Sequence, residues 1–310
     1  MSAPPYFKGA VTPNWEGFLA CISRQHTPDR VHFIELFLDE EVKISLCDRF
    51  AIDNTIDHND PWYLQKREIA IQRFLGYDYV VCGPSGMDLP LNWMVTEDTA
   101  ENSREQGRKY VNEHRGPITS WQDFEAYPWP DTVDFSTAEL EWYQKNLPDD
   151  MCLIGGLTGS FAEYLSWLMG YETLCYALYD QEDLVEAIFS RYLALAEHET
   201  KLTLEFERVK ILWGSDDMGF RSGPLISPTS MRQFVLPGHK RLAQLSHNAG
   251  RPYILHSCGN LDTIMDDLIE DVNIDGKHSF EDTILEVRDA KTLWGDRISI
   301  LGGIDMDFLC

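Results

Sequence analysis

Short apolar runs alternate with longer amphipathic segments along most of the chain, and this rhythm restricts the fold more than any other feature. The runs are rich in β-branched and aromatic residues, each is followed by turn residues, and they cover residues 31–37, 77–83, 151–157, 210–216, 252–257, 272–279 and 298–305. Between them lie segments with apolar residues at helical spacing, such as 164–169. Strands that alternate with helices predict an α/β fold, in which helices cover a parallel sheet.

The number of predicted strands is one short of a closed barrel. Seven runs precede the end of the chain, whereas a (β/α)8 TIM-type barrel has eight strand–helix units. We therefore expect a barrel whose last strand–helix unit is missing from this chain. A chain of 310 residues suits one domain spanning 1–310, and the mostly polar segment of about 84–150 is predicted to be an irregular insertion over one barrel end.

Charge excludes several classes of partner. The chain has 51 acidic and 26 basic residues and a net charge of -25, which would repel nucleic acid and anionic membranes. Residues 1–17 lack a basic stretch followed by an apolar run, and no apolar stretch is long enough to span a membrane, so we expect a cytoplasmic protein. Seven scattered cysteines without a C-x-x-C pair do not indicate a disulfide framework.

The most informative local pattern is a His-x-Cys pair at the end of a predicted strand. His256 and Cys258 follow the apolar run 252–255. Residues two apart on a strand face the same way, and active sites of barrels lie at the carboxyl ends of strands, so the pair can bind one ion. Cys258 also precedes a predicted helix, whose positive end favours a thiolate. The alternative is a hydrogen-bonded histidine beside a buried cysteine.

A distant cysteine favours the metal interpretation. Cys310 follows the last predicted strand, where a barrel rim would bring it near His256. An imidazole and two thiolates suit zinc, and an open fourth position would make the site catalytic. Candidates for that position are Glu35, Glu163, Asp216 or a water molecule. Glu163 begins a predicted helix, so it either stabilises the helix dipole or reaches the metal.

Polar residues at other strand ends are candidates for catalysis. Asp216 ends the run 210–216, and Asp217 follows it. Adjacent side chains point opposite ways, so we expect one of the two to bind substrate or transfer a proton while the other caps a helix or forms an ion pair. The alternative is an ordinary turn. His278 and Glu281 are acid–base or substrate candidates, or else members of a hydrogen-bonded rim. Glu35 lies among apolar residues and needs an ion-pair partner or a function.

Five segments together resemble the uroporphyrinogen decarboxylase superfamily over nearly the whole chain. They are RVHFIELFLDEEV, GSDDMGFRSGPLISPTSMRQFVLPGHKRL, HSCGN, KHSFED and ILGGIDMDFLC. The resemblance implies a (β/α)8 barrel. The porphyrin decarboxylases of this superfamily carry an arginine-rich loop after the first strand, whereas this chain has acids in IELFLDEEV. Its His-x-Cys pair and distant cysteine instead resemble the cobalamin-dependent methyltransferase branch, which includes coenzyme M methyltransferases and methoxyarene demethylases.

This resemblance implies a specific activity. It implies that His256, Cys258 and Cys310 bind zinc, and that a methyl group moves between a small methylated substrate, such as a methoxyarene, or a thiol and the cobalt of a corrinoid carried by a partner protein. Zinc would hold a thiolate or polarise an oxygen. The alternatives are a metal-free porphyrin decarboxylase and a truncated, non-catalytic barrel.

Overall fold

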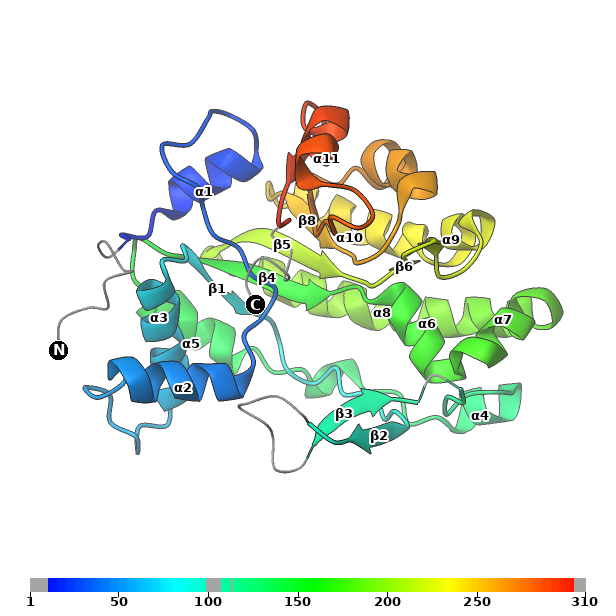
Figure 1. Ribbon diagram of the computed structural model, residues 1–310. Helices are drawn as coiled ribbons and strands as arrows, with labels where there is room; N and C mark the ends of the chain where they lie inside the picture. The colour runs from blue at the N-terminus through cyan, green and yellow to red at the C-terminus, as the bar shows by residue number, and fades with distance from the viewer. Residues whose placement is uncertain (1–10, 99–106, 113, 304–310) are drawn as a thin grey trace.

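Six parallel strands form the centre of the molecule in a computed structural model that describes residues 11–98, 107–112 and 114–303 (Figure 1). The strands are β1 (Tyr79–Cys82), β4 (Cys152–Thr158), β5 (Val209–Ser215), β8 (Tyr253–His256), β9 (Gly276–His278) and β10 (Ser299–Ile300). They lie in the sheet in the order in which they occur in the chain. Helical crossovers between successive parallel strands produce this order, as in a barrel. The predicted α/β class is therefore confirmed.

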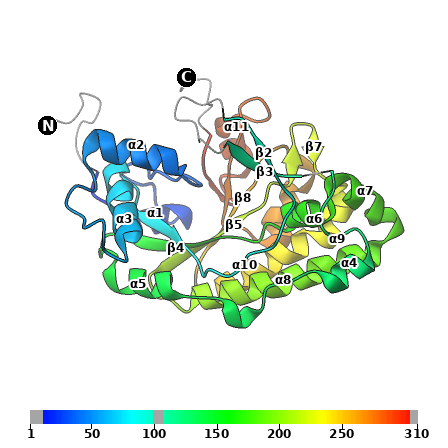
Figure 2. The ribbon, with the colours of Figure 1, turned by 90° about the horizontal axis from the view of Figure 1, so that it is seen from below.

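Helices cover the outer face of this sheet (Figure 2). Among them, α8 (Glu182–Leu204) packs on β4 and α10 (Leu236–Asn248) packs on β5. The other described α-helices are α1 (Trp15–Ile22), α2 (Glu40–Phe50), α3 (Tyr63–Leu75), α4 (Trp121–Ala126), α5 (Ala138–Asn146), α6 (Phe161–Met169), α7 (Tyr171–Asp180), α9 (Pro228–Phe234) and α11 (Val287–Trp294). There are also two 3-10 helices, η1 (Thr132–Asp134) and η2 (Asp262–Ile264), and a π-helix, η3 (Asp267–Val272), among the described residues. None of the described helices is long and apolar enough to cross a membrane.

The two faces of the sheet belong to different parts of the core. Leu212, Tyr253 and Leu255 point outward and pack in the large cluster beneath the helices. Their neighbours along the strands point the other way, because side chains alternate on a strand. Trp213 and Ile254 join the inner cluster, which also contains Phe18 and Ile22 of α1.

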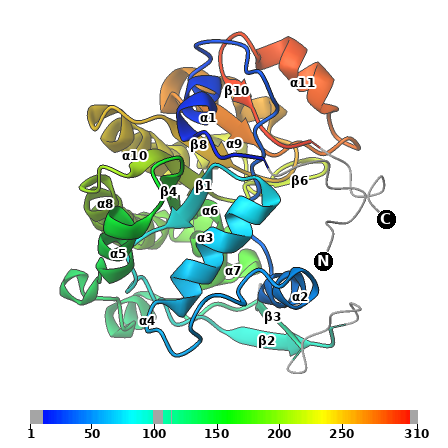
Figure 3. The same cartoon turned by 90° about the vertical axis from the view of Figure 1, so that its left-hand side faces the viewer.

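Helix α1 covers the end of the sheet at which the strands begin. Phe18 stacks on Tyr79, the first residue of β1, with ring centroids 5.6 Å apart. At the other edge of the sheet, the Ser299 hydroxyl donates to the Ile22 carbonyl at 2.7 Å. Helix α1 and β10 therefore lie side by side although they are far apart in the sequence (Figure 3). The opposite end, where the strands stop, is left for polar residues.

Residues 31–37 were predicted to form a strand, and this prediction is wrong. Their exposure alternates as expected, but they pair with no described strand. The segment is attached through side chains instead: Tyr79 Oη accepts the Glu35 N–H at 2.8 Å, and the buried Asp78 carboxylate binds Arg30 and His32. Alternating exposure along a segment shows which side chains are buried. A strand of a sheet also needs backbone hydrogen bonds to a neighbouring strand, and this segment has none to a described strand. Within the described residues the sheet is open, with β1 and β10 as its edges.

The segment of about 84–150 has more regular structure than predicted. It contains the antiparallel hairpin of β2 (Trp93–Thr96) and β3 (Arg108–Val111), then α4 and α5. Helix α5 covers the sheet, since Leu140 and Tyr143 pack with Val80 and Leu153. A second small hairpin, β6 (Gly219–Phe220) and β7 (Gly223–Pro224), follows β5. The single-domain organisation stays a prediction.

Candidate metal centre

Three potential metal ligands converge where β5 and β8 end. Asp217 Oδ1 lies 3.2 Å from His256 Nε2, which lies 3.7 Å from Cys258 Sγ. The ligand atoms of the three side chains all lie within 4.8 Å of one another. Ligands around a tetrahedral zinc ion, with bonds of about 2.0–2.3 Å, are roughly 3.3–3.8 Å apart. The three atoms are therefore close to the separations that one such ion needs.

The backbone around this cluster explains its placement. Ser215 of β5 pairs with His256 of β8, so the residues that follow the two strands begin at the same level. The Cys258 N–H then donates to Asp217 Oδ1 at 2.9 Å. Gly259 turns the chain with φ +78, and a Cβ there would lie 2.2 Å from the Gly219 carbonyl oxygen. Only glycine fits this turn, which directs the chain away from the cluster after Cys258.

His278 lies behind His256 rather than beside it in the cluster. The two Nδ1 atoms are 2.7 Å apart, and the Trp213 ring meets the His278 ring edge-on. Burial and the neighbouring His256 lower the pKa of His278 to about 3, so its ring is neutral at pH 7. A metal on His256 Nε2 leaves the His256 proton on Nδ1, where it donates to His278. The predicted acid–base candidate is thus placed to orient a ligand.

The charges in the cluster fit a cation. Burial, followed by the charge of Asp217, raises the pKa of Cys258 to about 12. Burial opposes ionisation of Asp217 as well, but hydrogen bonds from His256 and the Cys258 N–H lower its pKa to about 2. The expected stabilisation of a Cys258 thiolate by a following helix is therefore wrong, since only the short 3-10 helix η2 follows it. A bound dication beside the ionised Asp217 would be needed to release the thiol proton. A carboxylate, an imidazole and a thiol also form a donor set that zinc accepts.

Asp216 has a different surrounding from its neighbour Asp217. It is fully buried, and its two oxygens accept the Ala162 and Glu163 N–H groups at 2.9 and 3.0 Å. His239 Nε2 lies 2.9 Å from Asp216 Oδ2, and His239 Nδ1 lies 2.9 Å from Tyr253 Oη. Asp216 therefore satisfies the first N–H groups of α6, and the structure does not bring it into the ligand cluster.

Glu163 stands at the start of α6, close to both aspartates. Burial, and then the charges of Asp216 and Asp217, raise its pKa to about 8. Its carboxyl group is not among the three that converge, so its metal role stays a prediction. Cys310 lies outside the described residues, and its ligand role stays a prediction as well.

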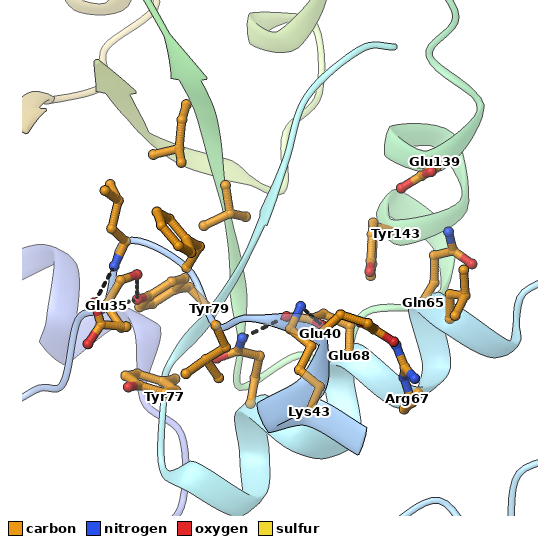
Figure 4. A pocket seen from close by; sticks show the side chains of 17 residues that line it. Glu35, Glu40, Lys43, Gln65, Arg67, Glu68, Tyr77, Tyr79, Glu139 and Tyr143 are labelled. Carbon is orange, nitrogen blue, oxygen red and sulfur yellow. Dashed lines mark hydrogen bonds and ion pairs between the residues drawn. The ribbon is translucent and has the colours of Figure 1, made fainter. Parts of the chain in front are cut away.

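The other predicted acids lie away from the ligand cluster. Glu281 Oε1 accepts the Gly259 N–H at 2.8 Å, so this carboxylate supports the turn after Cys258 from outside. Glu35 lines a separate cavity of about 430 Å³ between α2, α3 and the edge of the sheet (Figure 4). Both cations in that cavity are paired with carboxylates, Lys43 with Glu68 and Arg67 with Glu40. This cavity is thus separate from the ligand cluster.

Sequence reasoning missed Lys277. It is only 3% exposed, and its Nζ donates to the Ser257 and Ser279 carbonyls at 3.0 and 2.7 Å. These bonds link the loops after β8 and β9. Burial lowers the pKa of Lys277 to about 8. A lysine inside an apolar strand was the available signal, because such a residue needs partners.

Comparison with known proteins gives two matches. The family model described as uroporphyrinogen decarboxylase (URO-D) matches residues 109–310, more than half of the chain. Methylcobamide:CoM methyltransferase MtaA of Methanosarcina barkeri is 23% identical over 270 residues, which are 81% of this chain and 71% of the relative. The family match contains Asp217, His256 and Cys258.

Proposed function

The chain belongs to the uroporphyrinogen decarboxylase family, and we propose that it is a zinc-dependent methyltransferase within that family. The methyl group would move between a small methylated substrate or a thiol and the cobalt of a corrinoid carried by a partner protein. The superfamily expected from the sequence motifs is confirmed by the family match. Similarity to a relative named as a methylcobamide methyltransferase supports the choice of reaction.

The observation that carries the proposal is the convergence of Asp217, His256 and Cys258 within 4.8 Å. Two of the three were predicted as ligands from the sequence. They stand at the carboxyl ends of neighbouring parallel strands, the end at which enzymes of this architecture place their chemistry. Cys310 is proposed as a further ligand. The structural support for zinc is the donor set and its spacing.

A bound zinc ion would supply Lewis acidity, which stabilises a thiolate or polarises a methylated oxygen. His256 and Cys258 would hold the ion, with His278 fixing the tautomer of His256. Asp217 either joins them or remains the acceptor of the Cys258 N–H. Burial and the charges of Asp216 and Asp217 raise the pKa of Glu163, which favours its protonated form, and it lies beside the same aspartate. We propose that it exchanges this proton with the reacting oxygen or sulfur.

We propose a methoxyarene as the first substrate class to test. The support is the aromatic content of the chain, 12% of residues, together with the SDDMG and HSFED motifs at two strand ends. A thiol acceptor uses the same metal chemistry in the opposite direction. The acids in residues 35–41 disfavour a polycarboxylated porphyrin.

The test is the zinc content of anaerobically purified protein. Wild type is expected to bind about one zinc per chain, and His256→Ala and Cys258→Ala are expected to lose it. Cys175→Ala removes a cysteine of α7 outside the cluster and serves as the control. Methyl transfer is then followed by the absorbance change between cob(I)alamin and methylcobalamin. Wild type that binds no zinc with intact thiols would overturn the mechanism.

A further inference from the structure

A second cavity lies on the other side of the loop that carries Cys258. It has a volume of about 220 Å³ and is lined by the turn Gly259–Asn260, by Lys277 and Phe280, and by residues up to Trp294 of α11. His278 points to the inner face of the sheet, where it meets Trp213, so its neighbour Lys277 points to the helix side. Lys277 therefore reaches the cavity from the face of β9 opposite to His278, and the cavity adjoins the loop that carries Cys258.

Most of the wall is apolar. Leu261 and Met265 are each 3% exposed, and Trp294 is 8% exposed. Leu285 and Phe280 complete this wall. The rings of Phe280 and Trp294 are tilted by only 26°, with centroids 6.4 Å apart. Such an apolar wall suits a ligand with a flat aromatic or a branched aliphatic group.

The polar element in the interior is the ammonium of Lys277. It lies 4.7 Å from the centroid of the Phe280 ring and donates to two carbonyl oxygens. An ammonium has three donors, and no carboxylate lies within ion-pair distance of Lys277 in the described part of the chain. Burial lowers the pKa of Lys277 to about 8, while Cys258, Glu281 and Asp217 act on its charge from beyond ion-pair distance. Its third donor is directed to no described hydrogen-bond acceptor, so a bound carboxylate would supply the direct counterion that it lacks.

Two acids line the same cavity but at its outer edge. Glu281 and Asp262 are exposed, and Glu281 already accepts the Gly259 N–H. Water screens exposed charges more strongly than buried ones. The deep end of the cavity is therefore positive and its mouth is negative.

We propose that this cavity binds a small organic carboxylate, with its carboxylate on the Lys277 ammonium and its apolar or aromatic body against Phe280 and Trp294. The site is separate from the proposed methyl-transfer centre. It nevertheless touches the same loop, because Lys277 also holds the carbonyl of Ser257, the residue between His256 and Cys258.

The test uses benzoate as the probe, with the full chain at pH 7. Isothermal titration calorimetry of wild type is expected to show saturable binding of one benzoate. Benzamide and benzylamine, which have the same ring without a negative charge, are expected to bind about tenfold more weakly or worse. Phenylalanine distinguishes a free amino acid from a simple carboxylate as the better occupant. Absence of saturable benzoate binding up to about 10 mM, or equal binding of benzamide, would overturn the proposal.

Two variants locate the binding site independently. Lys277→Met keeps the length of the side chain without its charge and is expected to weaken benzoate binding about tenfold or more. Leu285→Trp fills the cavity, leaves the lysine intact and is expected to exclude the probe. Lys145→Met, at an exposed position of α5, is the control and is expected to bind as wild type does. Circular dichroism verifies that each variant is folded. Unchanged binding in Leu285→Trp would show that benzoate binds elsewhere and refute this assignment.

Discussion

The imidazoles of His256 and His278 face each other through their Nδ1 atoms, 2.7 Å apart. One of the two atoms must carry a proton and the other must accept it. His278 is neutral, because its pKa is lowered to about 3, and whichever ring of the pair donates, Nδ1 of His256 is occupied. The pair therefore fixes which nitrogen of His256 is left for a metal.

This arrangement predicts that His278→Ala lowers zinc affinity without removing a ligand. Loss of such a supporting group typically weakens metal binding about 10- to 100-fold. Competition against a chromophoric chelator measures the affinity. His247→Ala changes a partly exposed histidine of α10 and should leave the affinity unchanged. An affinity equal to wild type in His278→Ala would mean that the histidine pair does not orient the metal ligand.

Gly259→Ala should disturb both stability and metal binding. The new Cβ would lie 2.2 Å from the Gly219 carbonyl oxygen at a residue with φ +78. Gly250→Ala is a matched control, since Gly250 has φ +72 but nothing within 4 Å of the added Cβ. The backbone penalty alone is about 1 kcal/mol. Chemical denaturation should show a larger loss for Gly259→Ala than for Gly250→Ala, and equal losses would refute the close approach.

The same substitution should change a different property at each of the two neighbouring aspartates, stability at Asp216 and zinc binding at Asp217. Asp216→Asn places an amide against donors that now bind a carboxylate, so it should cost about 1–3 kcal/mol of unfolding free energy. Asp217→Asn keeps an acceptor for the Cys258 N–H and should change stability little while weakening zinc binding. Thermal unfolding and zinc titration separate the two effects. A reversed pattern would contradict the assignment of Asp216 to helix capping.

Glu199 on α8 predicts a pH dependence of stability. Thr158 donates to its Oε2 at 2.9 Å, and burial of the carboxyl raises its pKa to about 7, although the residue as a whole keeps some exposed surface. Below pH 4.5, its ordinary pKa, the carboxyl is protonated in both the folded and the unfolded state. As pH rises towards 7, the unfolded state ionises more readily, so the folded state loses stability.

Glu199→Gln removes this ionisation and keeps the acceptor for Thr158. The variant should be more stable than wild type by about 1–3 kcal/mol at pH 8 and by about nothing at pH 4. Urea unfolding at the two pH values measures this difference. Glu186→Gln, at an exposed position of the same helix, should show no such change. An equal effect of Glu199→Gln at both pH values would exclude burial of the charge as its cause.

The alternation of strands and helices was sufficient to predict the class of fold. Six of the seven predicted runs contain strands of the sheet. The run 31–37 failed because strand formation depends on a partner that periodicity does not specify. The strands of the described sheet follow one another in sequence order, as the strands of a barrel do. Closure of a barrel would require further strand pairing at the two edge strands, β1 and β10.

The candidate site was predicted in its parts but not in its arrangement. The strand positions of His256 and Cys258 were sufficient to place both on one side. The sequence could not show which of Asp216 and Asp217 faces the ligand cluster and which caps α6. Adjacent residues on a strand point to opposite sides, and the sequence does not reveal which side each one faces. The support of His256 by His278 depends on the register between β8 and β9, which pairs the two histidines directly. The role of Cys310 lies outside the described residues.

The contact between α1 and β10 joins residues 277 positions apart, Ser299 and Ile22. During synthesis α1 leaves the ribosome before β10, so its docking surface is completed only when β10 has been made. Phe18 and Ile22 are 2% and 3% exposed in the folded protein. Their side chains therefore stay more exposed to water until β10 is available. Such long-range closure slows folding and prolongs exposure of apolar surface. Helix α1 can thus complete this contact only after nearly all of the described chain has been made.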